Sequence, residues 1–397
     1  MAIDVERARS ETPGCRDVLH LNNAGAALMP QPVIDAQIAH IQREAMRGGY
    51  RAEADMQDGI EQTYASIARL LNCRIEEVAV VENATVAWSM AFHAFAFAPG
   101  DRILTAEAEY GSNFISYLKL AKHTGASVEV VPSDQDGQLS RVALARMIDQ
   151  GNVKLISVTH IPTNGGLINP VAEIGRIARA AGVPLLVDAC QSVGQLEIDV
   201  DAIGCDLLSA TGRKYLRGPR GSGFLYVRRN ILDRIEPPFL DIRSADWVAP
   251  GRYEMRPDAR RFENWEFNYA AVLGLRAAVD YALGWGLASI EERVIALGES
   301  LRRRLGDLRG VEVLDIGARK CGIVTFSVEG LAAEAIGQAL GRQAINVSLT
   351  GRASTLLDFE RRGLPELMVR ASVHYYNSED ELDRFAAALE ALIDRSS

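Results

Sequence analysis

Cysteine is scarce in this sequence of 397 residues, and its few copies form no motif. The five are Cys15, Cys73, Cys190, Cys205 and Cys321, with no CxxC pair among them. Their odd number and scatter argue against a structural zinc site and against a disulfide framework. We therefore expect reduced thiols, a cytoplasmic protein and no bound metal.

Long apolar runs and excess positive charge are also lacking. The most apolar stretch, residues 87–98, is too short to span a bilayer and contains His93. The opening residues, MAIDVERARSETPG, are polar and lack the apolar core of a secretory signal. The net charge of −9 argues against nucleic acid or an anionic membrane as the main partner. A globular protein that acts on a small molecule is the class that these absences leave.

Short apolar runs alternate with amphipathic helical segments between residues 78 and 227. Strands are predicted at 78–81, 102–105, 127–131, 153–159, 185–188, 206–209 and 223–227. Continuous apolar strands with helices between them indicate an α/β fold, whose mostly parallel sheet is covered on both faces. In such sheets the ligand lies at the carboxyl ends of the strands.

The alternation stops near residue 270, which indicates a second, smaller unit of α+β type. Helices are expected at 270–283, 290–308, 332–340 and from 379, with strands at 311–314, 322–326, 345–349 and 367–373. Two earlier helices, 33–47 and 58–71, flank the polar stretch 48–56. We predict a flexible lead-in over 1–20, a large domain over 21–268 and a small domain over 269–397.

Residues 209–223, SATGRKYLRGPRGSG, place Lys214 in a small, glycine-rich and cationic setting. A lysine between two buried runs is a candidate nucleophile that forms a Schiff base, and a salt-bridged lysine is the alternative. Thr211 and Arg213 beside it can offer a hydroxyl and a guanidinium to a phosphate. The glycines lead into a strand, whereas a dinucleotide fingerprint follows a strand and opens a helix.

Further polar residues follow other predicted strands. Asp188 closes LLVD, with Gln191 three residues later, and a carboxylate there either has a partner or caps a helix. Ala84 and Thr85 follow Asn83 at a helix start, where backbone amides either bind an anion or need only a cap.

Tyr110 and His160 stand at two more strand ends. The tyrosine is either a ligand contact or an ordinary rim residue, and the histidine can equally be a buried, hydrogen-bonded one. Together these side chains suit one ligand, a planar, phosphorylated pyridine aldehyde. It needs a lysine for the aldehyde, an acid for the ring nitrogen, a donor for the ring hydroxyl, a flat group to stack on and a phosphate cup.

On these motifs the sequence resembles the class V aminotransferases, pyridoxal 5'-phosphate enzymes of fold type I. The most specific segments are VDACQSVGQ, SATGRKYLRGPRGSGFLYV and VRASVHYYNSEDELDRF, and the resemblance covers residues 20–392. It implies a large domain that binds pyridoxal 5'-phosphate, a smaller C-terminal domain, an amino-acid substrate and a homodimer.

The resemblance also implies roles for the candidate residues. Lys214 would bind the cofactor aldehyde and act as the catalytic base, and Asp188 would pair with the pyridine nitrogen. Gln191 would meet the ring oxygen, and Tyr110 would stack on the ring. The other cofactor-binding candidates are Ala84, Thr85, Thr163, Thr211 and Arg213. The substrate-binding candidates are Arg370, Asn23 and Arg352.

Two departures from the family pattern narrow the function. Segment 351–365, GRASTLLDFERRGLP, has no cysteine, whereas desulfurases of this family carry a persulfide-accepting cysteine there. Segment 262–269, FENWEFNY, offers Trp265, Glu266 and Asn268 where a partner subunit often lends a threonine to the phosphate. We expect these residues near the dimer interface. In both departures the sequence resembles the branch of the family that contains lyase-like and epimerase-like members.

The first hypothesis is therefore a C–S lyase. Such an enzyme removes the Cα proton of a cysteine-derived amino acid and expels a sulfur group from Cβ, so that pyruvate and ammonia are released. The alternatives are an aminotransferase with a 2-oxo acid acceptor, an amino-acid epimerase, or a binding protein that retains the cofactor without turnover.

Overall fold

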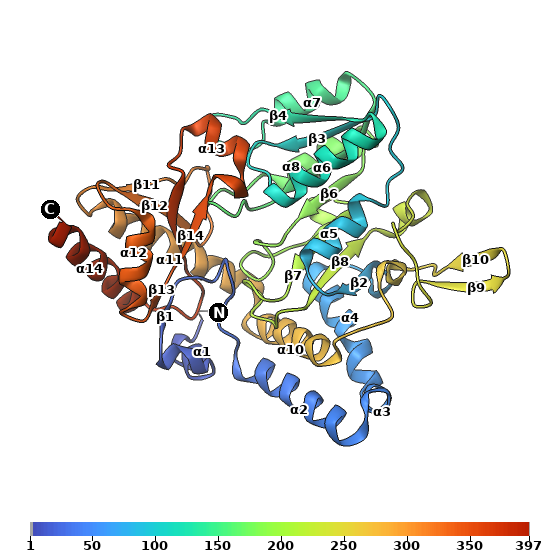
Figure 1. Cartoon of the computed structure of the whole chain (residues 1–397), viewed down its shortest axis with the longest axis horizontal. Coiled ribbons are helices and arrows are strands. Elements are labelled where there is room, and N and C mark those ends of the chain that lie inside the picture. The colour runs from blue at the N-terminus through green and yellow to red at the C-terminus, as the bar shows by residue number, and fades with distance from the viewer. Residues whose placement is uncertain (1–2, 397) are drawn as a thin grey trace.

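The computed structural model describes residues 3–396 and is built around a seven-stranded sheet (Figure 1). Its strands are β2 (Val78–Val81), β3 (Arg102–Ala106), β4 (Ser127–Val131), β5 (Val153–Thr159), β6 (Leu185–Asp188), β7 (Leu207–Thr211) and β8 (Gly223–Val227). Their order is β2-β8-β7-β6-β5-β3-β4, and only β8 runs against its neighbours. The mostly parallel sheet expected from the sequence is confirmed.

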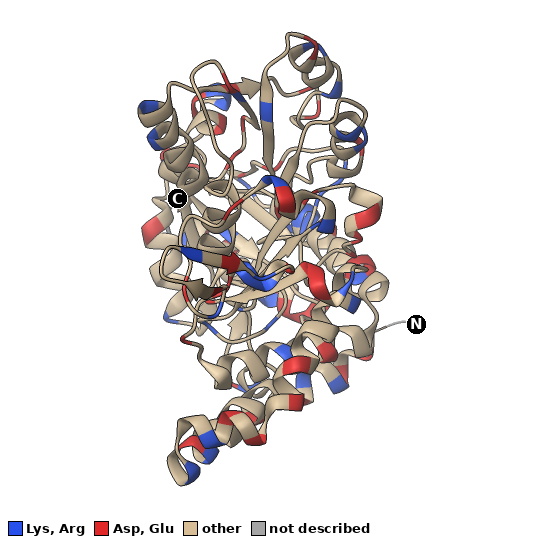
Figure 2. Cartoon of the chain, turned by 90° about the vertical axis from the view of Figure 1, so that its right-hand side faces the viewer, with Lys and Arg blue, Asp and Glu red and all other residues tan. Residues whose placement is uncertain are grey.

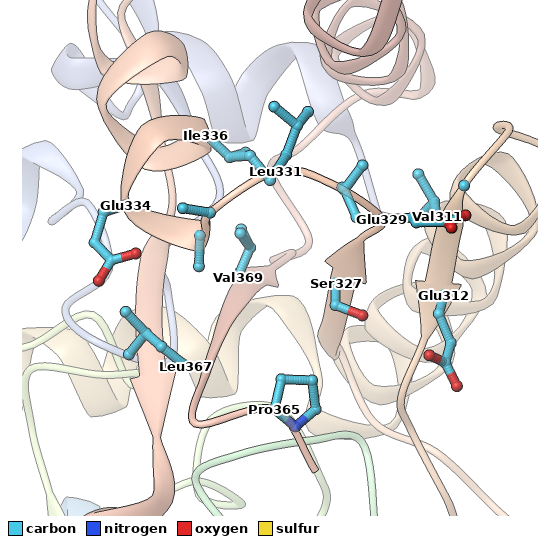
Figure 3. Close-up of a pocket in the computed structure, with 14 residues that line it drawn as sticks. Val311, Glu312, Ser327, Glu329, Leu331, Glu334, Ile336, Pro365, Leu367 and Val369 are labelled. Atoms are coloured by element: carbon cyan, nitrogen blue, oxygen red, sulfur yellow. The ribbon is translucent and has the colours of Figure 1, made fainter. Parts of the chain in front are cut away.

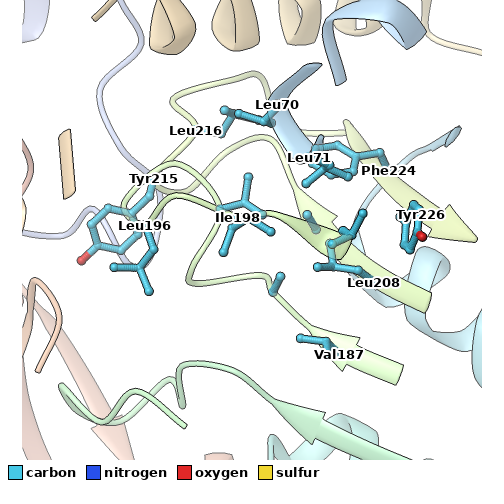
Figure 4. Close-up of a cluster of buried hydrophobic side chains, with 14 of the residues drawn as sticks. Leu70, Leu71, Val187, Leu196, Ile198, Leu208, Tyr215, Leu216, Phe224 and Tyr226 are labelled. Atoms are coloured by element: carbon cyan, nitrogen blue, oxygen red, sulfur yellow. The ribbon is translucent and has the colours of Figure 1, made fainter. Parts of the chain in front are cut away.

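The sheet is buried on both faces because neighbouring residues of its strands enter different cores. Val187 and Leu208 belong to one core, part of which Figure 4 shows, while Leu186 and Leu207 belong to the other. The first core takes side chains from α4 (Gln57–Leu71), α7 (Arg141–Asp149), α8 (Val171–Ala180), α9 (Val200–Ile203) and α10 (Tyr269–Trp285). The second takes them from α5 (Ala84–Phe92) and α6 (Gly111–Thr124). Continuous apolar strands are thus explained by helices on both sides.

A smaller antiparallel sheet lies in the C-terminal part, in the order β11-β12-β15-β14. Its strands are β11 (Val311–Val313), β12 (Ile323–Val328), β14 (Ser348–Gly351) and β15 (Leu367–Ser372). Helices α11 (Leu287–Gly306), α12 (Ala333–Gly341) and α14 (Glu379–Ser396) pack on it around a separate core. This arrangement agrees with the α+β pattern of the sequence.

The N-terminal segment is folded, and the expectation of a flexible lead-in is corrected. Within residues 3–20, the structure contains α1 (Val5–Ser10), the 3-10 helix η1 (Pro13–Arg16) and β1 (Leu19–His20). Ala8 and Thr12 are fully buried. Strand β1 pairs in parallel with β13 (Ile345–Asn346), and Leu19 and Leu21 join the core of the small sheet. Tertiary partners far along the chain order this segment.

Helix α10 packs against α2 (Gln31–Arg47) and α4, and its apolar side chains lie in the core of the large sheet. The boundary expected at residue 269 would separate α10 from that core. We therefore propose two domains, divided after α10 near Gly286, with residues 19–21 belonging to the smaller one.

Some elements were not anticipated. The polar stretch 48–56 contains α3 (Gly49–Asp55), residues 345–349 divide between β13 and β14, and segment 351–365 contains η5 (Arg352–Ser354) and α13 (Leu356–Arg362). A hairpin of β9 (Ala245–Ala249) and β10 (Arg252–Met255) projects from the body (Figure 1). The remaining 3-10 helices are η2 (Ile75–Glu77), η3 (Arg229–Arg234) and η4 (Ala259–Phe262). No helix in residues 3–396 is both long and apolar enough to cross a membrane.

Candidate active site

The strand order brings the carboxyl ends of β2, β3, β5, β6 and β7 to one edge of the sheet. A cavity of about 480 Å³ opens there. Nine of the residues that the sequence singled out line it: Ala84, Thr85, Tyr110, Thr163, Asp188, Gln191, Thr211, Arg213 and Lys214. The sheet topology therefore collects side chains that are up to 130 positions apart in the sequence into one site.

The loop between β7 and β8 presents Lys214 to this cavity. Arg217, with a φ of 62°, closes a turn in which its N–H donates to the Lys214 carbonyl at 2.9 Å. The Arg217 guanidinium is buried and donates to the hydroxyls of Thr12 and Tyr375 at 2.5 and 2.6 Å. The lysine loop is thus anchored to both ends of the chain. Within residues 3–396 Lys214 has no carboxylate within 4.0 Å, so the salt-bridge alternative does not hold.

Asp188 lies at the end of β6 and is 6% exposed. Its Oδ1 accepts a hydrogen bond from the Cys190 N–H at 2.9 Å, and its Oδ2 accepts one from Asn113 Nδ2 at 3.0 Å. Burial raises the pKa of this carboxyl above its usual value, and the hydrogen bonds from Cys190 and Asn113 oppose the shift. Two donors leave lone pairs for a cationic ligand in the cavity.

Gln191 offers an unsatisfied atom to the same cavity. Its Nε2 donates to the Ala24 carbonyl at 3.2 Å and to Thr163 Oγ1 at 3.3 Å. Its Oε1 is buried without a hydrogen-bond partner. A buried polar atom without a partner is costly, so a ligand hydroxyl that donates to it would be stabilised.

Arg370, on β15, holds Thr163 from the other side. Its Nη1 donates to the Thr163 carbonyl and to Thr163 Oγ1, both at 2.8 Å, and its Nε donates to Ser348 Oγ at 3.0 Å. Burial lowers the pKa of Arg370 to about 10, and no carboxylate among residues 3–396 pairs with it. A buried guanidinium without a counter-charge is a natural receptor for a carboxylate.

The start of α5 forms another wall of the cavity. Asn83 caps this helix, since its Oδ1 accepts from the Val86 N–H at 3.0 Å. The cap does not use the amides of Ala84 and Thr85, which come first in the helix and lie at the cavity. A Cβ on Gly223 would lie 2.9 Å from the Asn83 backbone, so β8 approaches this corner closely only with glycine there. Asn83 can therefore cap the helix while the first amides of α5 remain able to bind an anion.

Cationic groups face the same end of the cavity. Arg213 donates to the Gly25 carbonyl, Thr211 donates to the Ser222 carbonyl at 3.4 Å, and Arg220 lines the cavity from an exposed position. Helix amides, a hydroxyl and two guanidiniums together suit a phosphate group.

The family profile described as Aminotransferase class-V matches residues 19–385 of this chain. The chain belongs to the class-V aminotransferase family.

This class-V aminotransferase family member is similar to proteins described as desulfurases and C–S lyases. It is 31% identical to the cysteine desulfurase of Serratia proteamaculans over 411 residues, which cover 99% of each chain. The structure of cysteine desulfurase from Thermococcus onnurineus NA1 matches it with a TM-score of 0.90, at 28% identity and 99% coverage of each chain. The cystine C–S lyase C-DES, solved with its product cysteine persulfide, matches with a TM-score of 0.85. That match has 25% identity over 96% of this chain and 99% of the C-DES chain.

None of the three expected substrate contacts lines the cavity itself, although Arg370 holds Thr163, which does. The side chain of Asn23 is occupied, because its amide donates to the His20 and Ser372 carbonyls at 3.3 and 2.7 Å and accepts from the Tyr376 hydroxyl. Arg352 pairs with Glu360 on α13, and neither Asn23 nor Arg352 lines the cavity. The substrate-binding roles of Asn23 and Arg352 stay predictions, and in this structure Ser372 and Glu360 hold the two side chains.

His160 also stays outside the cavity lining. It is 6% exposed, its backbone N–H donates to the Asp188 carbonyl at 2.9 Å, and burial lowers its pKa to about 4. The histidine is therefore buried as expected, but its ring Nδ1 has no hydrogen-bond partner within residues 3–396, so the expected side-chain hydrogen bond is not found at that atom. Sequence reasoning missed Glu109 and Asn113, which pack beneath Tyr110 and Asp188. The sequence did contain a signal for these two residues. Glu109 follows the end of strand β3, as other site residues follow their strands, and Asn113 comes one helical turn later.

A second cavity, of about 670 Å³, lies beside the small sheet (Figure 3). Apolar side chains such as Leu331, Ile336 and Val369 line it, with glutamates around them. Its lining contains no lysine, arginine, histidine or cysteine, so the candidate catalytic side chains lie at the first cavity. Within residues 3–396, no cluster of three or more histidine, cysteine, aspartate or glutamate side chains is arranged to hold a metal.

Proposed function

We propose that this chain is a pyridoxal 5'-phosphate-dependent C–S lyase that acts on a cysteine-derived amino acid. One observation carries the proposal: Lys214, without an ion pair, shares a cavity with the buried carboxylate of Asp188. An aldehyde-binding lysine and an acid for the ring nitrogen are the two groups that this cofactor requires. The relatives described as cysteine desulfurases and as a cystine C–S lyase support the choice of substrate.

The residues present fit the cofactor. The unsatisfied Oε1 of Gln191 can accept a hydrogen bond from the ring hydroxyl, and the free amides at the start of α5 can bind the phosphate. Tyr110 lines the cavity and offers a flat face for the ring. A solved variant of C-DES, 25% identical to this chain, carries glycine covalently linked to its PLP cofactor.

The proposed mechanism assigns one task to each side chain. Bound pyridoxal phosphate supplies an electron sink for the electron pair left on Cα. Lys214 would hold the cofactor aldehyde, and its free amine would take the proton from Cα. Asp188 would keep a proton on the pyridine nitrogen. Arg370 would bind the substrate carboxylate through Nη2, because Nη1 and Nε donate to Thr163 and Ser348, and so would orient the Cα–H bond.

The reaction type is tested with the holoenzyme and a panel of cysteine, cystine and S-substituted cysteines. A C–S lyase releases pyruvate and ammonia in repeated turnovers and keeps its cofactor in the aldehyde form. Stoichiometric pyridoxamine phosphate would instead indicate an aminotransferase, and inversion at Cα without pyruvate an epimerase. Release of neither product with any substrate would leave the binding-protein alternative and would refute the proposed function.

We further propose that the sulfur leaves as a small molecule without passing through a protein thiol. Segment 351–365 carries Ser354 and Thr355 where a sulfur acceptor would be needed, and neither forms a persulfide. The segment is held in place, because Asn164 donates to Thr355 at 2.7 Å and Arg361 pairs with Glu107 at 2.7 Å. All five cysteines are free, which supports the reduced, cytoplasmic setting expected from the sequence.

A variant with all five cysteines replaced by alanine or serine should therefore keep turnover close to that of the wild type. The measurement is pyruvate release by folded protein with its full complement of cofactor. Cys190→Ser alone is the matched control, because Cys190 is the only cysteine that lines the cavity. A folded, loaded and inactive cysteine-free variant would contradict the prediction. If Cys190→Ser were equally inactive, the loss of turnover would be due to Cys190.

We also propose a homodimer that uses the side of the molecule around α2, α3 and the hairpin of β9 and β10. Large apolar side chains are exposed there: Met46 (82%), Tyr50 (79%), Trp247 (77%), Tyr253 (51%) and Trp265 (50%). Glu44 and Tyr50 border the same depression as Trp265 and Tyr269, which joins α2 and α3 to the expected interface near 265–268. Figure 2 looks onto this side and shows charges of both signs interspersed. Large exposed apolar and aromatic side chains along this side support a protein–protein contact.

The dimer is tested by sedimentation of the wild type and of Met46→Asp at micromolar concentration. We expect a dimer for the wild type and dissociation for the variant, because a charge would be buried in an apolar contact. Ile115→Asp is the control, since Ile115 is 68% exposed but lies on α6, away from this surface. A wild type that is monomeric and fully active would refute the proposal.

A further inference from the structure

Two carboxylates are buried side by side beneath the cavity, and the proposed reaction uses only one of them. Glu109 is 3% exposed and follows the end of β3, which lies next to β5 in the sheet. Burial, together with the nearby Asp188 carboxylate, raises the pKa of Glu109 to about 7, against hydrogen bonds that lower it. Burying one acid next to another is costly, and those hydrogen bonds offset part of the cost.

The surroundings of Glu109 consist of hydrogen-bond donors. Its Oε2 accepts from Thr105 Oγ1 and from the Thr159 N–H, both at 3.0 Å. Its Oε1 accepts from the Tyr110 N–H at 3.0 Å, from Asn113 Nδ2 at 2.8 Å and from the Thr159 hydroxyl. The N–H groups of Tyr110, Thr159 and Asn113 can only donate and therefore favour the charged form, whereas the hydroxyls of Thr105 and Thr159 can also accept from a protonated carboxyl. Together the five contacts fix the position of the carboxyl group.

Asn113 connects Glu109 to Asp188. The same nitrogen, Nδ2, donates to Glu109 Oε1 at 2.8 Å and to Asp188 Oδ2 at 3.0 Å. An amide nitrogen has two hydrogens, so each carboxylate receives one of them. If Asn113 turned its amide over, its oxygen would face both carboxylates. Glu109 thus determines that the Asn113 side chain presents its NH2 group, and not its oxygen, to Asp188.

The consequence concerns the atom of Asp188 that faces the cavity. Asn113 fixes Oδ2 and the Cys190 N–H fixes Oδ1, which together set the plane of the carboxylate. The donor to Oδ2 also stabilises the charged form of Asp188 in a buried position, where burial favours the neutral one. A ligand cation in the cavity needs both the orientation and the charge.

We propose that Glu109 is a positioning residue for the reaction at this site, acting through Asn113 to orient the Asp188 carboxylate and keep it ionised. The inference rests on the proposed function, because it assigns Asp188 to the ring nitrogen of the cofactor. Glu109 itself lines no part of the cavity and touches neither substrate nor cofactor in this arrangement. Its effect reaches the site only through the amide.

The test compares Glu109→Gln, Asn113→Ala and the double variant with the wild type, all loaded with pyridoxal phosphate. We expect each single variant to lower kcat about tenfold to a hundredfold, the range set by one hydrogen bond to a charged group. KM for the amino acid should change little, because Arg370 is untouched. The double variant should lose no more than Asn113→Ala, because both substitutions interrupt one connection.

The absorption spectrum of the bound cofactor provides a readout that does not depend on turnover. Both single variants should lose the ring-protonated form to a similar extent. Ser66→Ala is the control for damage to buried polar contacts. Ser66 lies on α4, is 1% exposed, donates to Asp280 at 2.6 Å and does not line the cavity. It should keep both the spectrum and kcat.

Several results would overturn the proposal. These are a kcat of Glu109→Gln within about twofold of the wild type, multiplicative losses in the double variant, or an equal loss in Ser66→Ala. If Glu109→Gln does not fold, the test rests on Asn113→Ala. A wild-type spectrum and kcat in that variant would show that the hydrogen bonds through Asn113 do not act on Asp188. Failure of the proposed function is recognised separately, since the wild type would then release no pyruvate.

Discussion

Lys214→Ala is expected to lose turnover by about 10⁴-fold or more, since the lysine is proposed both to bind the cofactor and to act as base. The wild type should be coloured by a Schiff base at this residue, and borohydride should fix the cofactor there irreversibly. In the variant no covalent adduct should form at the site. Peptide mapping by mass spectrometry after reduction measures this directly.

Lys119→Ala is the matched control, because Lys119 lies on α6 and does not line the cavity. It should retain both the adduct and the turnover of the wild type. If Lys214→Ala still forms a single borohydride-reducible adduct and releases pyruvate, another amine holds the cofactor. The assignment of Lys214 would then be wrong, whatever the family resemblance.

Asp188→Asn should lower kcat by about a hundredfold to a thousandfold while most of the cofactor stays bound. Asparagine has nearly the same shape, but its single oxygen can accept only one of the two hydrogen bonds that come from the Cys190 N–H and from Asn113. It lacks the negative charge that keeps a proton on the pyridine nitrogen, and a neutral ring is a poor electron sink.

Asp188→Asn is measured as kcat per bound cofactor, with cofactor content taken from the absorbance of the protein. Asp206→Asn is a suitable comparison, because Asp206 is also a carboxylate near a strand of the same sheet and lies outside the cavity. Turnover of Asp188→Asn within a few-fold of the wild type would remove Asp188 from the mechanism. Complete loss of cofactor would instead show that Asp188 is needed for cofactor binding.

Much of the large sheet could be predicted because its strands are buried on both faces. Continuous apolar runs such as Val78–Val81 and Gly223–Val227 match the observed strands to the residue. The same regularity placed Lys214, Asp188 and Gln191 at one edge, since parallel strands end together. The structure brings these side chains to one cavity, and their chemical roles remain proposals for experiment.

The rest depended on partners that are distant in sequence. Asn23 was assigned to substrate binding, but its amide is held by Ser372, which lies 349 positions further along the chain. Helix α1 has only six residues and is ordered by packing, which propensity does not reveal. Arg352 was expected near the substrate, yet a glutamate eight positions later pairs with it. Composition and periodicity contain no information about such contacts.

The pairing of β1 with β13 has a consequence for biosynthesis. The large sheet can form while the chain is still being made, because all its strands lie between residues 78 and 227. The small domain cannot form so early. Leu19 pairs with Ile345, and Asn23 donates a hydrogen bond to Ser372, so both contacts require the C-terminal part of the chain. Contacts of such long range close late and slowly. At roughly 5–20 residues per second, residues 19–21 stay without these partners for many seconds on the ribosome. The segment that finally joins the two ends is therefore the part most exposed to chaperones and proteases during synthesis.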